Sequence, residues 1–360
     1  MLAKAAGHAF DEAALDRELS HGIQNAVREQ MAAGLDLVND GELSKVNFKF
    51  YTQSRIGGFE MLPAEQGRRL DITARDQVRY ADYFRANPVP WLKNPPTTRP
   101  VCVRDLHYVG QVDLARDIAN LKNAGAAYGT AGLFMTALAP SSIEHWMANR
   151  HYADDEAFVR AIAEVMRTEY EAISAAGFLL QIDAPDLLDA WNCHPNMSVA
   201  EYRAHTEMRI DVLNDALRNI PREKIRIHVC WGSYHGPHSD DIPLADMIDL
   251  IFRVKAGCYN IEASSPGHAH EMAVFETIKL PHDTSLMPGV VGHFCDQLEH
   301  PLAVADRLVR FARLLGRENV QAGTDCGLGD KCGHEAVSWA KFRRMAEGAR
   351  IASDILWGRA

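Results

Sequence analysis

The stretch IRIHVCW, residues 225–231, begins with apolar side chains at alternate positions and therefore predicts a short buried strand. His228 and Cys230 stand at its C-terminal end, two residues apart. Side chains two apart on a strand lie on the same face of a sheet, so an imidazole and a thiol can converge on one point there. The stretch therefore predicts a strand that carries two metal-ligand side chains to its end.

Two further strand-like runs end in side chains of the same kind. CYNIEAS carries Glu262 at its end, and NVQAGTDC carries Cys326. Taken singly, such a Cys is more often a small buried hydrophobe, and such a His more often a hydrogen-bonded structural residue. Taken together, the residues have the composition of a tetrahedral zinc site, although their spacing is much wider than in a zinc finger. The candidate ligands are His228, Cys230, Glu262 and Cys326.

Strand-like runs alternate with amphipathic helical runs along most of the chain. This alternation, with apolar strands and short connections, predicts a parallel sheet covered by helices. Seven or eight such units indicate a closed (β/α)8 TIM barrel. An open doubly wound sheet is less favoured because no glycine-rich phosphate fingerprint follows an early strand. We therefore predict one α/β domain over residues 1–360, a (β/α)8 barrel with its functional side chains at the C-terminal ends of the strands.

The start of the chain does not supply a convincing first barrel strand. Residues 1–10, MLAKAAGHAF, contain no β-branched side chain. A barrel without its first strand would leave unpaired backbone groups at a gap. We expect the first strand to be missing here, so that an upstream segment, the run PVCVRDL or a partner chain would close the gap.

Composition and charge exclude several functional classes. The chain has 38 basic and 48 acidic residues, a net charge of −10, and no basic block, so nucleic acids and anionic membranes are poor partners. No apolar run approaches the roughly 18 residues that a membrane-spanning helix needs. The polar N-terminus does not resemble a signal peptide, and seven scattered cysteines fit a reducing cytoplasm. We expect a cytoplasmic protein that acts on small molecules, and the sequence leaves a homo-oligomer open.

Several of these motifs resemble one known family. HVC, NIEASS and GTDCGLG resemble the zinc site of cobalamin-independent methionine synthase, in its C-terminal catalytic barrel, and LVNDGE and LQIDAPDL resemble the strand ends on its substrate side. The resemblance covers roughly residues 12–332. GRENVQAGTDCGLG and HVCWGSYHGPHSDDIPL are closer still to the short single-barrel branch that includes epoxyalkane:coenzyme M transferase.

The resemblance implies a zinc-dependent thiol methyltransferase or alkyltransferase of methionine biosynthesis. His228, Cys230 and Cys326 would ligate zinc, with Glu262 as the fourth ligand. Zinc suits this task because a bound thiol loses its proton near neutral pH and becomes a nucleophile. A homocysteine-like thiol would then attack a methyl or alkyl donor as its zinc thiolate.

The resemblance also assigns residues to the substrates. Glu42 and Asp183 correspond to positions that hold the amino group of homocysteine. His293, in the run MPGVVGHFCDQLEH, lies about one residue from the family's loop histidine and is the candidate general acid. No counterpart of the family's tryptophan-bearing folate segment follows GLFMTALAP, so the donor stays open. Addition of coenzyme M to an epoxide and an inactive thiol-binding barrel remain alternatives.

Other polar residues carry rival interpretations. A metal hydrolase could use Asp183 and Asp186 as paired carboxylates, although two cysteine ligands argue against that class. The run HGPHSDD has a metal-like composition, but we favour a solvated substrate lid. His268 and His270 are expected at the surface or behind the site. The remaining cysteines are expected to serve in packing, with Cys332 near enough to Cys326 to be a spare thiol.

Overall fold

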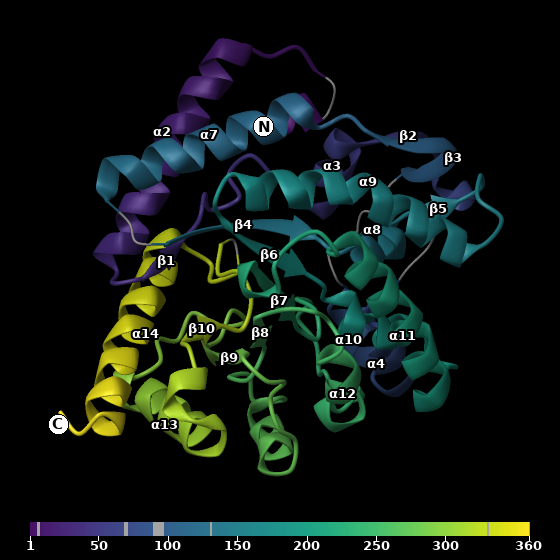
Figure 1. Cartoon of the computed structure of the whole chain (residues 1–360). Coiled ribbons are helices and arrows are strands. Elements are labelled where there is room, and N and C mark those ends of the chain that lie inside the picture. The colour runs from purple at the N-terminus through teal and green to yellow at the C-terminus, as the bar shows by residue number, and fades with distance from the viewer. Residues whose placement is uncertain (6–7, 68–70, 89–96, 130–131, 330, 360) are drawn as a thin grey trace.

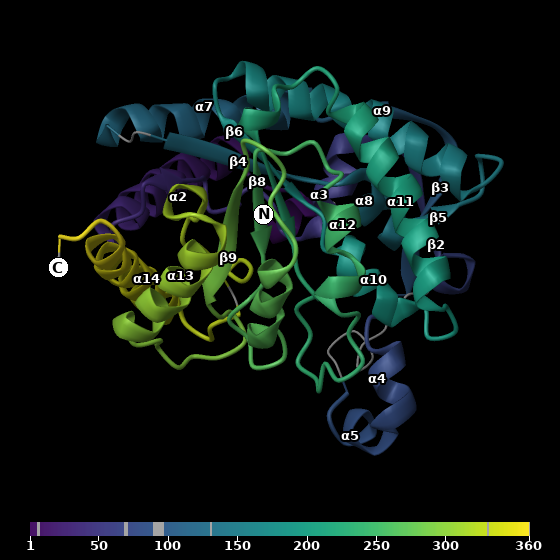
Figure 2. The same cartoon turned by 60° about the horizontal axis from the view of Figure 1, so that its bottom comes forward.

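The computed structural model describes residues 1–5, 8–67, 71–88, 97–129, 132–329 and 331–359 (Figure 1). Its main sheet has seven strands, all parallel, in the order β1-β4-β6-β7-β8-β9-β10. The sheet curls, and helices pack around it (Figures 1 and 2). The predicted parallel barrel sheet is therefore confirmed. Its strands are β1 (Leu37–Val38), β4 (Gly132–Leu138), β6 (Leu179–Asp183), β7 (Ile225–Val229), β8 (Cys258–Ile261), β9 (Ser285–Val291) and β10 (Gly323–Thr324).

The gap expected at the start of the barrel is present in the described part of the chain. Residues Leu2–Ala5 form the short helix α1 instead of a strand. Strand β1 pairs with β4 and strand β10 pairs with β9, and no ladder joins β1 to β10 among the described residues. The main sheet is therefore an open, curled parallel sheet.

A small second sheet lies beside the main one, with the order β2-β3-β5. Its strands are β2 (Ile56–Pro63), β3 (Thr98–Tyr108) and β5 (Ala148–Asn149). The run PVCVRDL belongs to β3 and pairs antiparallel with β2. The suggestion that this run closes the barrel is therefore wrong.

Long amphipathic helices cover the main sheet where the sequence placed them. In α9, the N-cap Asp154 accepts a hydrogen bond from the backbone of Ala157, and the apolar face of the helix, including Phe158 and Ile162, is fully buried. The last helix, α14, covers Glu335–Leu356. The long covering helices are α2 (Glu12–Ala32), α7 (Gln111–Tyr128), α9 (Asp155–Ala175), α11 (Val199–Ala216), α13 (Pro301–Leu315) and α14 (Glu335–Leu356).

Several connections carry only short helices. Residues 243–257 form a 3-10 turn and one α-turn, and residues 269–276 form a 3-10 helix. Helices α8 and α10 follow directly from strands β4 and β6. The short helices are α3 (Phe48–Arg55), α4 (Ala74–Arg79), α5 (Ala81–Ala86), α8 (Pro140–Trp146), α10 (Asp186–Cys193), α12 (Ile248–Ile251), η1 (Ala64–Gln66), η2 (Arg222–Lys224), η3 (Leu244–Asp246), η4 (Ala269–Glu276) and η5 (Arg317–Asn319).

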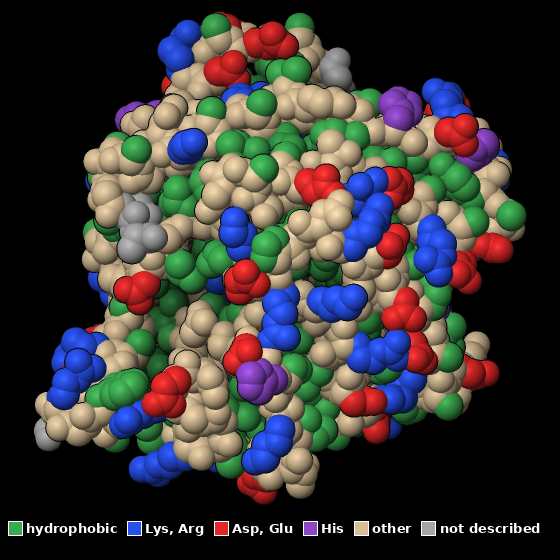
Figure 3. Space-filling view, in the orientation of Figure 1, with side chains coloured by type: hydrophobic (Ala, Val, Ile, Leu, Met, Phe, Trp, Pro, Cys, Tyr) green, Lys and Arg blue, Asp and Glu red, His purple; other side chains and the backbone are tan. Residues whose placement is uncertain are grey.

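Acidic and basic side chains are interspersed on the face shown in Figure 3, without a patch of one sign. Within the described ranges, no helix combines the length and the apolar character needed to cross a bilayer.

A buried ionic cluster joins the small sheet to the covering helices. The side chain of Arg55, at the end of α3, is 3% exposed, and its guanidinium lies 2.7 Å from Asp117 of α7 and 3.3 Å from Glu169 of α9. The hydroxyl of Tyr108, in β3, donates to Glu169 at 2.6 Å. Each charge is buried, so each depends on its partners.

We expect Arg55→Ala to lower the free energy of unfolding by about 3–5 kcal/mol, because it removes the buried guanidinium that faces the two buried carboxylates of Asp117 and Glu169. Arg104→Ala is the control: Arg104 and Glu60 form a largely exposed pair, whose loss costs less than about 1 kcal/mol. Urea unfolding of the two variants measures the difference. Equal losses would show that the cluster does not support the fold.

Candidate functional site

The candidate residues gather at one edge of the main sheet, where the parallel strands end. The C-terminal end of β7 carries His228 and Cys230, and the segment after β10 carries Cys326. One ligand atom from each of these residues lies within 4.8 Å of those of the other two. His228 and Cys230 are buried, and Cys326 is half-buried. We call this group the thiolate centre.

The imidazole of His228 is fixed in one tautomer by its neighbour in the sheet. The side-chain amide of Asn260, in β8, donates to the carbonyl of Met287 at 2.8 Å, so its oxygen faces His228. That oxygen therefore accepts the N–H of His228 Nδ1, at 2.6 Å. In the neutral ring Nε2 carries a lone pair, and this buried atom has no hydrogen-bond partner among the described residues. Although burial acts against it, the Cys326 thiolate raises the pKa of His228 to about 9, so a metal ion would take the place of a second proton on the ring. A metal-ligating histidine has this arrangement.

The two thiols of the centre affect each other strongly. A hydrogen bond from Cys230 holds the pKa of the Cys326 thiol well below its usual value, although burial acts in the opposite direction. The same hydrogen bond, together with burial, raises the pKa of Cys230 far above its usual value. The pair therefore favours one thiolate as it stands, and a cation beside it would favour two. Two soft sulfur donors and one imidazole match the ligand chemistry of zinc.

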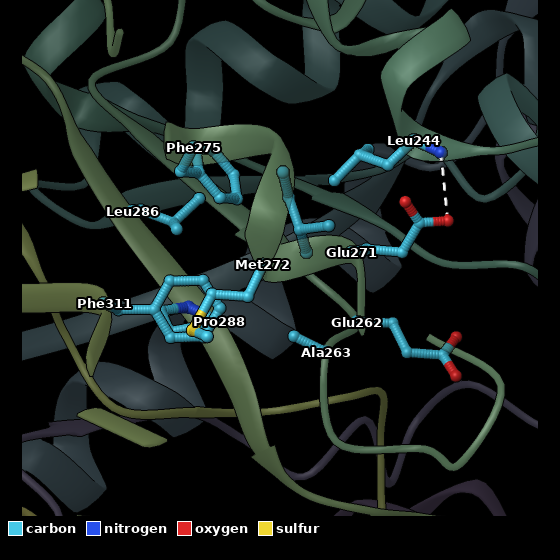
Figure 4. Close-up of a pocket in the computed structure, with 10 residues that line it drawn as sticks. Leu244, Glu262, Ala263, Glu271, Met272, Phe275, Leu286, Pro288 and Phe311 are labelled. Carbon is cyan, nitrogen blue, oxygen red and sulfur yellow. Dashed lines mark hydrogen bonds between the residues drawn. The ribbon is translucent and has the colours of Figure 1, made fainter. Parts of the chain in front are cut away.

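The carboxylate of Glu262 lies beside this group without joining it. Its Oε2 accepts a hydrogen bond from the backbone N–H of Trp231 at 3.2 Å, and the side chain is fully buried. Burial and the charge of Asp325 raise its pKa to about 7. Figure 4 shows this carboxylate directed away from the apolar side chains of Phe275 and Leu286. Glu262 is placed as a neighbour of the thiolate centre.

Asp325 joins two strand ends of the site and was not singled out in the sequence. One carboxylate oxygen accepts the backbone N–H groups of Ala263 and Ser264, both at 2.9 Å, and the other accepts the Ser264 hydroxyl at 2.5 Å. Both ends of this contact adjoin a candidate ligand. Cys326 directly follows Asp325, and Glu262 directly precedes Ala263. The carboxylate therefore fixes the distance between these two side chains. The sequence offered one indication of this role, since Asp325 is the charged residue directly before Cys326 in the motif GTDCGLG.

Glu42 and Asp183 line one small cavity beside the thiolate centre, together with Lys45, Tyr51 and neighbouring apolar residues. Asp183 is the register partner of His228 in the sheet, so the cavity adjoins the centre. Burial and the charge of Glu42 raise the pKa of the Asp183 carboxyl to about 6. The site thus offers two carboxylates to a small cationic group.

The carboxylate of Glu42 is held in place by two side chains. The hydroxyl of Thr136 donates to it at 2.6 Å, and the ammonium of Lys45 lies 3.3 Å from the same oxygen. Lys45 also donates to the backbone carbonyl of Thr136 at 2.7 Å. Lys45 is therefore already bound within the wall of the cavity, and it too was missed in the sequence.

His293 is fully buried next to the thiolate centre. Its Nε2 lies 3.2 Å from the hydroxyl of Ser233, which also lies 3.8 Å from the sulfur of Cys326. Burial lowers the pKa of His293 to about 4, although the charge of Cys326 acts against this. The imidazole is therefore neutral at pH 7 and in contact with the centre through Ser233.

The expectation of a solvated lid holds for only part of the loop that follows β7. His235 is exposed, but the side chains of His238 and Asp241 are 14% and 4% exposed and bond to each other at 2.9 Å. His268 is also buried and bonds to Asp241, whereas His270 is exposed. The prediction was wrong for His238 and Asp241 because the loop folds inward onto the body of the protein.

Asp186 and Cys332 take structural positions. Asp186 is the first residue of α10, and its carboxylate accepts a hydrogen bond from Ser142. Asp183 bonds instead to Gln181, at 2.8 Å, so the two carboxylates have separate partners. Cys332 is buried, with its thiol 3.9 Å from the backbone carbonyl of His293. A paired-carboxylate site is therefore not assembled.

Comparisons with known proteins identify the class to which this fold and site belong. The family model of the cobalamin-independent synthase catalytic domain matches residues 93–350. The chain therefore belongs to this family, as the motifs of the sequence predicted.

Individual relatives are similar over almost the whole chain. A methionine synthase of Pyrococcus furiosus is 23% identical over 346 residues, which are 95% of this chain and 83% of the relative. A methionine synthase of Sulfurisphaera tokodaii is 23% identical over 350 residues, 95% of this chain and 85% of the relative. Among solved structures, a B12-independent methionine synthase from Shewanella sp. W3-18-1 superposes with a TM-score of 0.73 at 17% identity, covering 97% of this chain and 92% of the other. That level of identity shows a shared fold.

Gly289 gives a test of the packing around Asp325. A Cβ at Gly289 would lie 1.9 Å from Asp325 Oδ1 and 2.7 Å from its Cα, so backbone would have to move. We expect Gly289→Ala to cost at least about 1–3 kcal/mol of unfolding free energy. Gly327→Ala is the control, since a Cβ there meets nothing within 4 Å. Urea unfolding that showed similar stability for the two variants would contradict this packing.

Proposed function

We propose that this protein is a zinc-dependent S-methyltransferase that activates a homocysteine-like thiol for attack on a methyl donor. The observation that carries the proposal is the meeting of one unpartnered imidazole nitrogen and two cysteine thiols beside a cavity lined by two carboxylates. Membership of the cobalamin-independent synthase family supports it, as do curated relatives named methionine synthase.

The thiolate centre would hold the ion through His228 Nε2 and the sulfur atoms of Cys230 and Cys326. When bound there, zinc would lower the pKa of an incoming thiol so that it reacts as a thiolate. Glu262 is proposed as the fourth ligand and as the one that yields to the substrate, because a carboxylate is the hardest donor of the four. Its bond to the Trp231 N–H gives it a resting position beside the centre.

Glu42 and Asp183 are proposed to bind the ammonium group of the thiol substrate. Asp183 neighbours His228 in the sheet, so an ammonium held between the carboxylates lies a short chain length from the sulfur position. Two carboxylates would repel the sulfonate of coenzyme M, and the ammonium of Lys45 is already bound to Glu42 and Thr136. The cavity therefore favours an amino-acid thiol over the epoxide and coenzyme M alternative.

His293 is proposed to relay the proton that the leaving atom of the donor requires. Because burial lowers its pKa to about 4, its protonated form is a strong acid but is rare at pH 7. His293 is thus suited to transferring a proton through Ser233, but it does not remain protonated at pH 7.

The oxidation state of the cysteines indicates the cellular compartment in which the protein would act. No disulfide joins any of the seven cysteines, all of which lie in the described ranges, and oxidation of Cys230 and Cys326 to a disulfide would abolish the proposed function of the thiolate centre. We infer a reducing compartment, the cytoplasm.

The metal assignment predicts that Cys230→Ser and Cys326→Ser lose most of their zinc, because each removes one thiolate ligand. After reloading with Co2+, each variant should show a much weaker thiolate-to-metal absorption than the unsubstituted protein. Cys295→Ser is the control, since Cys295 is exposed and outside the group. Unchanged absorption in both ligand variants would remove the basis of the proposed site.

The substrate assignment predicts that Glu42→Gln and Asp183→Asn raise the KM for homocysteine by roughly 10–100-fold, because each loses a charged hydrogen bond of about 1.5–3 kcal/mol. Zinc content should stay unchanged. Asp36→Asn is the control, because Asp36 is exposed and directly precedes the N-terminal end of β1, away from the cavity. A preference for coenzyme M over homocysteine in the unsubstituted protein would overturn the assignment and favour the epoxide alternative.

A further inference from the structure

A second group of metal-ligand side chains lies outside the thiolate centre. His238 Nδ1 and His268 Nε2 both lie 2.9 Å from the same oxygen, Oδ2 of Asp241. One ligand atom from each of the three residues lies within 4.8 Å of those of the other two. All three side chains are largely buried. We call this group the imidazole cluster.

The outer atoms of the imidazole cluster have partners that orient the inner ones. His238 Nε2 lies 3.0 Å from the backbone carbonyl of Tyr234, and the other oxygen of Asp241 accepts the side-chain amide of Asn192 at 2.6 Å. The ring of His268 stacks on that of Trp231, with centroids 3.6 Å apart. Metal-binding histidines and carboxylates are held by such outer hydrogen bonds.

The protons of His238 create a conflict that a cation would resolve. A carbonyl can only accept, so the nitrogen of His238 that faces Tyr234 must carry a hydrogen. In a neutral ring, Nδ1 then presents a lone pair to the carboxylate of Asp241, and the two repel. Either the ring carries a second proton, or a cation lies between nitrogen and oxygen.

A neighbouring carboxylate adds to the demand for positive charge. Asp189, in α10, is 7% exposed, and its Oδ1 has no hydrogen-bond partner among the described residues. Burial, together with the charges of Asp186 and Asp241, raises the pKa of this carboxyl well above its usual value. A buried carboxylate without a partner is costly unless it is neutral or faces a cation.

We propose that His238, Asp241 and His268 bind a first-row divalent metal ion at a second site of this protein, separate from the thiolate centre. Adjacent ligands of a six-coordinate ion, each about 2.1 Å from the metal, lie about 3.0 Å apart. The N···O separations of 2.9 Å, here those of hydrogen bonds, are close enough to that spacing for an ion to replace the bonding protons without a large movement of the side chains. Two imidazoles and a carboxylate without sulfur form a different donor set from the thiolate centre.

The second site joins the two segments that leave the thiolate centre. His238 and Asp241 belong to the segment after Cys230, and His268 belongs to the segment after Glu262. Glu271, three residues beyond His268, accepts the backbone N–H of Leu244 and strengthens the same junction (Figure 4). The bound ion would therefore hold together the loops that carry two of the proposed zinc ligands.

Titration of the metal-depleted full chain with Co2+ tests the proposal. We expect two ions per chain, only one of which produces the thiolate absorption. The Cys230→Ser, Cys326→Ser double variant should still bind one Co2+, without that absorption. Adding His238→Ala should abolish this binding, and adding Asn192→Ala should weaken it by roughly 10–100-fold, as for outer partners of metal ligands.

Matched controls separate this site from weak surface binding. His235→Ala and His270→Ala alter exposed histidines two or three positions from the ligands, and each should leave Co2+ binding unchanged. A double cysteine variant that is folded by circular dichroism and binds no Co2+ would overturn the second site. The thiolate absorption of the unsubstituted chain reports separately on the proposed zinc centre, so the two proposals can fail independently.

Discussion

The register of four parallel strands is the constraint on which the site depends. Asp183 of β6 pairs with His228 of β7, His228 with Asn260 of β8, and Asn260 with Met287 of β9. One row across the sheet thus supplies the proposed substrate carboxylate, the proposed metal ligand His228, the amide that orients His228, and the carbonyl that orients that amide. Because side chains alternate between faces, a slip of one residue in any ladder would send one of them to the opposite side.

Desolvation explains why so many charged groups at this edge have shifted pKa values. Burial raises the pKa of the carboxyls of Asp183, Glu262 and Asp189. A buried carboxylate that stays ionised must face a cation or several N–H groups. Asp325 satisfies this need with two backbone N–H groups and a hydroxyl. The others lack such a set, and an ammonium or a metal ion is the kind of partner that would stabilise them.

The sequence predicted the parts of the structure that follow from periodicity and from strand ends. Parallel strands, long helices and the convergence of His228, Cys230 and Cys326 were predicted because each depends on local pattern and on the common edge of a parallel sheet. The hydrogen-bond partners of Asp325, Lys45 and the imidazole cluster were not predicted, because these contacts join residues far apart in the sequence and leave no local pattern. The loop after β7 was misjudged for the same reason: its polar composition suits solvent, but its carboxylate and imidazoles bond to one another.

Glu42 shows how the fold favours the position of a functional group over local stability. Its backbone is left-handed, with φ of 54°, directly after Gly41, which has φ of 66°. A residue with a side chain pays roughly 1–3 kcal/mol for this conformation. Hydrogen bonds offset the strain: the Asp40 carboxylate accepts the Glu42 N–H at 3.0 Å, and Thr136 and Lys45 hold the side chain. An extended backbone would carry the carboxylate along the strand direction, whereas this turn brings it back over the strand ends to line one cavity with Asp183. The strain therefore accompanies the placement of the Glu42 and Asp183 carboxylates around one small cavity.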